Sequence, residues 1–456
     1  MYLHETSPIS FQSQREGVGV FTTEQIRCLE EDTILLPLPY SQIKRKLSAA
    51  FTSQRSVSRS SASSASMSVD GFRPDIVHTF DIPIVEESIE VLEFIGFVAE
   101  AATVIYNRYL SRPHPDRNPD DLMAYVSGHI SSLKLSQYDN MDPSEALRSI
   151  GLNSQIQEAI TDPRFSHIFG TQPLYYWAND TVETNYAALL GRQRLLRNYA
   201  NRRMTYKRKH NQAKQGTALS QEQGPSSPAS AISATIDITP SDFQFPERRV
   251  ILQSDIRMLD DHLSLYKGKA HPELRDEGEI IRNDGSANLS ALATLPGGDF
   301  NSKSLAQYWS PKKETAEEYR LYAARRSPVA DTCIVHIQVP LSFINRLHIE
   351  NLWYSRNWKE YIWTCRKNLT LDRKFDLLKQ ADVVRGHVCS TISGRITRIP
   401  WENVQTHISE SNVMRLPSGR KVTLWVFLQE STIDQLAEEI RGRIHFTIFE
   451  ARHTHS

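Results

Sequence analysis

Residues that could carry chemistry lie mostly in the second half of this chain, and none of them forms a familiar catalytic motif. The sequence contains no G-x-G-x-x-G, G-x-x-x-x-G-K-[ST], H-E-x-x-H or G-x-S-x-G pattern, so the common nucleotide-binding loops, zinc proteases and serine hydrolases lose support. His387 and Cys389 are spaced to face one way on a strand, as metal ligands sometimes are, but no second pair stands at ligand spacing. We therefore predict no metal site.

Several short local patterns remain once those motifs are excluded. Residues 265–268 read Leu-Tyr-Lys-Gly and close a strand-like run with a glycine, where the backbone can approach a ligand closely. Asp-Phe-Asn at 299–301 precedes Tyr-Trp-Ser-Pro at 308–311, and we expect Ser310 to cap a helix that begins at Pro311. A segment rich in aromatic residues follows at 358–363.

The order of these patterns resembles the ADP-ribosyltransferase-like fold, particularly its compact bacterial-type members. That family combines a Tyr-His/Arg-Gly strand, an Asp-Phe-Gly turn, an aromatic-x-Thr strand and a Glu-Trp helix start. The resemblance spans residues 265–428, just over a third of the chain, and includes strand-like runs at 333–339, 381–388 and 425–428. It implies two small sheets that clasp NAD as a substrate, with chemistry at the nicotinamide N-glycosidic bond.

The resemblance also implies roles for individual residues. Cleavage of the glycosidic bond passes through an oxocarbenium-like transition state that a carboxylate stabilises, and Glu360 is the catalytic candidate. Lys267 would contact the ribose or the pyrophosphate, Tyr308 or Trp309 would stack on nicotinamide, and Ser310 would support the ribose pocket. The predicted NAD-binding residues are Tyr266, Lys267, Gly268, Tyr308, Trp309 and Ser310.

Each of these residues also has a structural interpretation. Residues 357–360 read Asn-Trp-Lys-Glu, a capping box in which Glu360 would only accept a backbone hydrogen bond. Tyr308 and Trp309 fit a buried strand, and Lys267 fits a solvated surface. Lys267 stands where the family has His or Arg, and a lysine lacks both a planar fork and a ring nitrogen.

The first half of the chain predicts a helical domain that follows a polar, Ser-rich segment. From residue 53 to residue 68, nine of sixteen residues are Ser, and we expect residues 1–70 to be largely disordered, with a short anchor at 33–38. Residues 75–210 predict an all-helical domain, because capping side chains precede a proline at 118–119, 142–143 and 162–163.

The second half has a different texture. Residues 211–245 are rich in Gln, Ser, Ala, Pro and Gly and predict a flexible linker. Residues 250–452 mix β-type runs with helical patterns and predict an α+β domain. The resemblance implies that this domain has the ADP-ribosyltransferase-like fold of small split sheets. The fold class is therefore α+β overall, with an all-α N-terminal domain.

Charge and cysteine content limit the possible partners and the cellular compartment. The 456 residues carry 53 basic and 53 acidic side chains, which argues against a globally basic nucleic-acid binder. Nine Lys or Arg and no acid occur from 184 to 221, a run that fits a nucleic-acid contact, a nuclear import signal or a solvated helix end. Four cysteines without C-x-x-C spacing indicate that the protein works in a reducing, intracellular compartment. We expect a protein of the cytoplasm or nucleus, without a membrane segment.

Two functions from different classes follow. The first is NAD-dependent ADP-ribosyl transfer to a protein acceptor, or NAD glycohydrolysis, by the C-terminal domain. The second is a non-catalytic interaction protein that keeps the same fold while its helical domain binds a partner protein.

Overall fold

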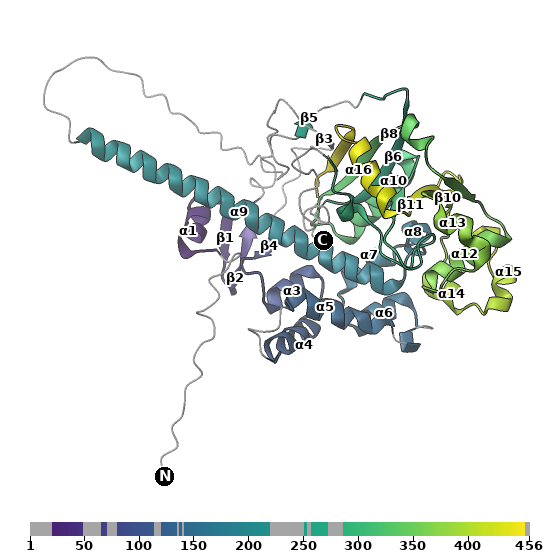
Figure 1. The fold of residues 1–456 in the computed structure, drawn as a ribbon. Helices are drawn as coiled ribbons and strands as arrows, with labels where there is room; N and C mark the ends of the chain where they lie inside the picture. The colour runs from purple at the N-terminus through teal and green to yellow at the C-terminus, as the bar shows by residue number, and fades with distance from the viewer. Residues whose placement is uncertain are drawn as a thin grey trace, which may run out of the picture.

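The computed structural model describes residues 21–48, 65–70, 80–113, 120–134, 136–138, 141–218, 250–252, 257–271 and 286–451. Over these residues the protein is a mixture of helices and three small sheets, which confirms the α+β class. One long helix, α9 (Leu174–Ala218), runs along the body, and its C-terminal end extends away from it (Figure 1).

A small sheet lies beside α9 and comes from the N-terminal part of the chain. Helix α1 (Thr23–Glu31) begins with a capping box in which Thr22 and Gln25 satisfy each other's backbone donors. The antiparallel hairpin of β1 (Leu35–Leu38) and β2 (Ser41–Leu47) follows, and β4 (Phe80–Pro83) pairs with β2 as the third strand.

Residues 21–48 form a helix and two strands, which is more than the short anchor at 33–38 that the sequence predicts. Leu29, Leu35 and Leu47 pack in one buried cluster with Leu189 and Leu196 of α9. The segment has too few apolar residues to offset its own ordering entropy, and the apolar face of α9 provides the missing burial. The rest of the stretch, apart from residues 65–70, lies outside the described residues.

The first helical region has the caps that the sequence predicts. Asp142 precedes Pro143, and its carboxylate accepts hydrogen bonds from the backbone of Ser144 at 2.9 Å and of Glu145 at 3.4 Å. Residues 118–119 lie outside the described residues, and Asp121 caps the helix that follows them. The helices are α3 (Ile89–Ile95), α4 (Ala99–Leu110), α5 (Leu122–Ile130), α6 (Pro143–Ser149), α7 (Ser154–Ile160), α8 (Ser166–Phe169) and α9.

Helix α9 is longer than the sequence indicates. It continues to Ala218, so residues 211–218 are helical, whereas we expected them to begin a flexible linker. Gln, Ala and Lys are good helix formers, and here they extend an existing helix rather than nucleate a new one. Residues 219–245 lie outside the described residues. No helix in the described ranges is both long and apolar enough to cross a membrane.

Two further sheets form most of the second half. The five-stranded sheet has the order β5-β3-β12-β8-β6, and the four-stranded sheet has the order β7-β11-β10-β9. The β-type runs at 265–268, 333–339, 381–388 and 425–428 correspond to β6, β8, β10 and β11. The strands are β3 (Ala65–Asp70), β5 (Val250–Leu252), β6 (His262–Ala270), β7 (Gln307–Trp309), β8 (Thr332–Pro340), β9 (Ile349–Leu352), β10 (Val383–His387), β11 (Thr423–Phe427) and β12 (Ile444–Phe449).

Helices connect these strands and cover their faces. Helix α10 packs along β6, and Leu436 of α16 joins the buried cluster between the two sheets. The helices are α10 (Lys313–Arg326), α11 (Leu341–Ile344), α12 (Arg356–Arg366), α13 (Asp376–Gln380), α14 (Ser393–Arg398), α15 (Val404–His407) and α16 (Glu430–Glu439).

A backbone bridge joins the two larger sheets. Tyr266 of β6 and Ser310, which follows β7, exchange backbone hydrogen bonds of 2.7 and 2.9 Å. An edge strand of each sheet is thereby joined to the other sheet. The junction brings together two of the local patterns that the sequence analysis singles out.

The helical region and the α+β region share one hydrophobic cluster. Ile160, Phe169 and Trp177 belong to the same buried group as Tyr322 and Trp358. The Tyr322 hydroxyl donates a 2.7 Å hydrogen bond to the Ile160 carbonyl, which fixes α10 against the end of α7. The division into domains at 75–210 and 250–452 stays a prediction, and this cluster is one contact between the two ranges.

A buried histidine pair predicts how stability depends on pH. His336 and His445 lie opposite each other on β8 and β12, and burial lowers the pKa of each to about 4. The unfolded chain takes up protons below about pH 6.5, whereas these folded histidines do so only near pH 4, so stability falls as the pH falls between the two values. We expect a loss of roughly 2 kcal/mol per histidine from pH 7 to pH 5, measured by urea unfolding.

The double variant His336→Gln/His445→Gln should flatten this dependence. Equal slopes for the double variant and the parent chain would show that other groups dominate.

Candidate functional site

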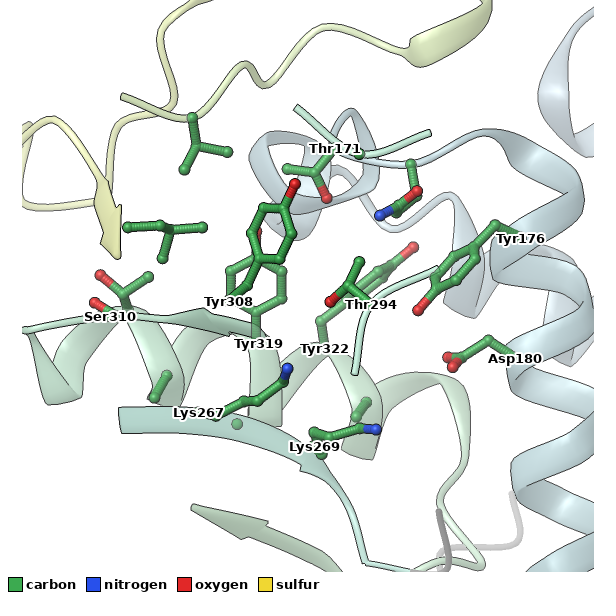
Figure 2. Close-up of a pocket in the computed structure, with 18 of the residues that line it drawn as sticks. Thr171, Tyr176, Asp180, Lys267, Lys269, Thr294, Tyr308, Ser310, Tyr319 and Tyr322 are labelled. Carbon is green, nitrogen blue, oxygen red and sulfur yellow. The ribbon is translucent and has the colours of Figure 1, made fainter. Parts of the chain in front are cut away.

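A cavity of about 160 Å³ lies where the two larger sheets meet the helical region. This space, the junction cavity, is bounded by β6, by α10, by the loop that leads into β7, and by residues at the start of α9 (Figure 2). Its wall is unusually rich in aromatic rings. The aromatic lining residues are Tyr176, Trp177, Tyr266, Tyr308, Tyr319 and Tyr322.

Strand β6 supplies one wall. Tyr266, Lys267, Gly268 and Lys269 all line the cavity, and Figure 2 shows the two lysine side chains reaching into the view from this strand. The Lys267 ammonium donates a hydrogen bond to the Leu292 carbonyl, so its position is fixed rather than swinging freely.

Gly268 allows α10 to lie close to this wall. A Cβ atom added at position 268 would stand 1.8 Å from the Ala316 carbonyl oxygen of α10, a distance that no real side chain tolerates. The sequence predicts a close approach to a ligand at this glycine, but the neighbour that packs there is helix α10, which brings Tyr319 and Tyr322 to the cavity.

Tyr308 of β7 fixes the turn that precedes its strand. Its hydroxyl donates to Asn301 Oδ1 at 2.7 Å and accepts from the Phe300 backbone at 2.9 Å. Burial raises the pKa of Tyr308 well above its ordinary value, so the ring carries a neutral hydroxyl. Asn301 also donates to three backbone carbonyls of this turn, which makes the cavity wall rigid.

Trp309 does not line the cavity. Successive side chains on a strand point to opposite faces, so with Tyr308 at the cavity Trp309 turns into the apolar cluster between the sheets, where it is fully buried. The Trp309 ring lies behind the cavity wall, with its centre 5.9 Å from the Lys267 ammonium nitrogen. Its predicted stacking on a ligand is not supported by this position.

Ser310 lines the cavity, but it is not the cap of α10. The helix begins at Lys313 with Lys312 at the cap position, and the Ser310 hydroxyl accepts from the Lys312 backbone at 3.0 Å. The reason is the backbone pairing of Ser310 with Tyr266, which holds this residue in the sheet junction and delays the helix by two residues.

Glu360 lies outside the junction cavity, on α12. Its carboxylate is buried and pairs with Lys374, and it accepts hydrogen bonds from Gln405 Nε2 at 2.8 Å and from Arg356 Nε at 3.4 Å. These contacts hold the segments around residues 374 and 405 against α12. The arrangement gives Glu360 a structural task and brings it no nearer to the other predicted residues.

The capping box predicted at 357–360 is also absent from α12. The cap is Ser355, whose hydroxyl accepts from the Trp358 backbone at 3.2 Å, two residues earlier than the sequence suggests. Glu360 therefore lies just after the first turn of α12 and is buried, as are Tyr361 and Trp363.

The start of α9 supplies the opposite wall, which sequence reasoning missed. Thr171, Tyr176 and Asp180 line the cavity from this side, and Figure 2 shows the Tyr176 hydroxyl and the Asp180 carboxylate directed inward. Asp180 forms an ion pair of 2.6 Å with Arg326 of α10. The residues lie more than eighty positions from β6 in the sequence, and no local pattern marks them.

A metal site finds no support in the described ranges, where no three His, Cys, Asp or Glu side chains are grouped closely enough to hold an ion. Comparison with known proteins gives this arrangement no relative either. No protein-family model, no curated protein and no solved structure matches the chain. The chemistry of the cavity therefore has to be argued from its own residues.

The close packing at Gly268 gives a direct test of the cavity wall. Gly268→Ala should destabilise the protein by about 2 kcal/mol or more, because the added methyl group meets backbone atoms that cannot rotate away. Gly128→Ala is the matched control, since it is an exposed site inside α5 with nothing within 4 Å of the new atom. That control should stabilise by roughly 0.5–1 kcal/mol. Similar unfolding midpoints for the two variants would contradict the described packing.

Proposed function

We propose that the junction cavity holds the nicotinamide end of NAD and that the chain cleaves the N-glycosidic bond, by transfer or by hydrolysis. One observation carries this proposal. Residues 266–268 and residues 308 and 310, which the resemblance to ADP-ribosyltransferases selects from two separate parts of the sequence, lie on one cavity at the junction of two sheets.

The size and lining of the cavity suit a single planar ring. An engineered protein cavity of about 150 Å³ holds benzene, so a volume of about 160 Å³ is enough for the nicotinamide ring but not for a dinucleotide. The tyrosine rings that line the cavity offer stacking faces to a planar ring. The ribose and the remaining parts of NAD would lie along the mouth of the cavity.

The cations of β6 suit the charged part of the same ligand. Lys267 and Lys269 are two positions apart on β6, so their side chains project from the same face of the strand. An ammonium is a compact donor for phosphate oxygens, although it cannot make the paired contacts of an arginine. We assign Lys267 to ribose or pyrophosphate binding. The catalytic assignment of Glu360 stays a hypothesis that the cavity geometry does not favour.

A second function has an observation of its own. The buried Asp299 at the cavity is neutralised by Arg366, and Glu360, outside the cavity, is neutralised by Lys374. A site whose carboxylates are committed to ion pairs suits ligand binding without turnover. The second proposal is therefore an interaction protein that keeps the fold, with the helical region available to a partner protein.

Measuring NAD binding to the full chain, together with nicotinamide release, tests both proposals and distinguishes them. We expect calorimetric binding of NAD, and we expect Lys267→Ala to weaken it by about tenfold or more, the scale of one lost charge-assisted contact. Lys303→Ala, an exposed lysine that contacts Thr370, is the matched control and should bind as the parent chain does. Release of nicotinamide supports the enzyme, and binding without release supports the interaction protein. No binding at millimolar NAD refutes both.

A further inference from the structure

One face of the four-stranded sheet is covered at one end and open at the other. Ile349, Val383 and Phe427 lie at the covered end, where they pack into the cluster between the two larger sheets. Side chains two positions apart on a strand share a face, so residues further along each strand extend this face beyond the cover. Those residues are half-buried or exposed. They form what we call the sheet-face patch: Asn351, Trp353, Arg385, His387 and Thr423.

Trp353 gives the sheet-face patch an exposed aromatic ring. It keeps 43% of its surface exposed, and its ring centre lies 5.1 Å from that of His387. Strand β9, which Trp353 follows, is the last strand of its sheet. An indole face that is open to solvent at the end of a sheet is a platform on which a planar base can stack.

His387 is held in one orientation beside this ring. Its Nδ1 atom accepts a 3.1 Å hydrogen bond from the Tyr354 backbone, so the proton of the neutral ring is on Nε2. Burial lowers the pKa of His387, and nearby Lys421 lowers it further, which keeps the ring neutral at neutral pH. The patch therefore presents a second flat ring and a fixed N–H donor next to the indole.

Arg385 adds a cation to the patch, two positions before His387 on β10. Its Nε atom donates to Asn351 Oδ1 at 3.0 Å, and the guanidinium carbon lies 5.0 Å from the centre of the Trp425 ring. No carboxylate pairs with Arg385 among the residues that the structure describes. An amide and an aromatic ring thus orient the guanidinium, and its charge stays available for a ligand.

A second group of charges at the edge of the patch is positive in sum. Arg415 and Lys421 lie opposite each other in a β-bridge and share one carboxylate, that of Glu410, at 3.4 and 2.6 Å. Two cations against one acid leave a positive charge in excess. Both cations lie close enough to His387 to lower its pKa, which places the excess charge beside the patch. We therefore expect a ligand of this face to be an anion.

The patch and the junction cavity lie on opposite sides of the four-stranded sheet. Leu424 lines the cavity, whereas its neighbours Thr423 and Trp425 turn to the other face. A ligand bound to the patch would not touch the residues proposed to hold NAD, so the two sites can be tested separately.

We propose that the sheet-face patch binds single-stranded nucleic acid, RNA or DNA, with a base stacked on Trp353 and the flanking phosphates held by Arg385 and Lys421. A single strand offers at every nucleotide the two features that this face can recognise, an open planar ring and a negative charge. A duplex hides the faces of its bases, and the acidic residues of a peptide offer charge without a ring. The overall neutrality of the chain agrees with such a local site rather than with a broadly basic binder.

Binding to the full chain is measured by fluorescence anisotropy with a labelled single strand of about ten nucleotides, once as RNA and once as DNA. The tighter of the two identifies the ligand. We expect log affinity to fall with log salt concentration with a slope of about −1.4, the value for two phosphate contacts on a single strand. The matching duplex should bind at least about tenfold more weakly, because its bases cannot stack on Trp353. Equal affinity for the duplex, or no binding of either single strand at low salt, overturns the proposal.

The stacking contact is tested by substitution. Trp353→Ala should weaken single-strand binding by about tenfold or more, the scale of one lost stacking contact. Trp401→Ala is the matched control, because Trp401 is 46% exposed and its ring contacts Trp363 instead of the patch. Trp353→Phe keeps an aromatic face and should bind within about threefold of the parent chain. Equal losses in Trp353→Ala and Trp401→Ala, or in Trp353→Ala and Trp353→Phe, contradict stacking on this ring.

The phosphate contact has its own signature. Arg385→Gln should reduce the salt slope by about 0.7, one phosphate contact on a single strand. Arg346→Gln, at an exposed arginine that pairs with Glu439, is the matched control and should keep the parent slope, as should Lys267→Ala in the junction cavity. A parent slope in Arg385→Gln would assign the binding to other cations, such as those of α9. Polyglutamate that displaces the strand as well as unlabelled strand does, at equal charge, would assign the face to an acidic protein. Either result overturns the proposal.

Discussion

The buried guanidinium of Arg366 is the interaction on which the arrangement of the site depends. Its side chain is fully buried on α12, pairs with Asp299 at 2.7 Å, and donates to the carbonyls of Cys389 at 2.6 Å and of Thr391. It also reaches the Gly170 carbonyl, at 3.4 Å, just before α9. An arginine can be buried only when its donors are satisfied, so four separate segments must meet at this point. Asp299 begins the turn that Tyr308 closes, and the cavity wall follows from that turn.

The same point brings the helical region into the site. A Cβ atom at Gly170 would stand 1.6 Å from the Ser390 carbonyl oxygen, so only glycine lets the end of α8 approach the loop after β10. This approach places the first turns of α9 beside β6 and α10. A charge that needs partners from distant segments thus specifies one relative position of the two regions, whereas apolar contacts alone would tolerate several.

The sequence predicts the sheet side of the site better than its helical side. Runs rich in Val, Ile and Phe identify β8, β10 and β11. The glycine after Lys267 marks a close approach, but of helix α10 and not of the ligand that the sequence suggested. Tyr308 and Trp309 are neighbours on a strand, so the sequence already allowed only one of them to face a ligand. Asp180 could not be found in this way, because its position beside β6 depends on tertiary contacts. The order of residues 21–48 escaped for the same reason, since their burial is provided by α9.

Helix α9 has three structural roles along its length, although its sequence predicts only one continuous helix. Its first turns close the cavity, its middle buries the N-terminal sheet, and its later basic residues face acids at the C-terminal end of α1. Arg203 pairs with Asp32 at 3.1 Å and Lys207 with Glu31 at 2.8 Å, so part of the basic run that suggested nucleic-acid binding is neutralised within the chain. Exposed ion pairs of this kind add little stability. Their main consequence is electrostatic, because each acid on α1 lowers the positive potential that α9 presents and with it the counterion release that drives phosphate binding.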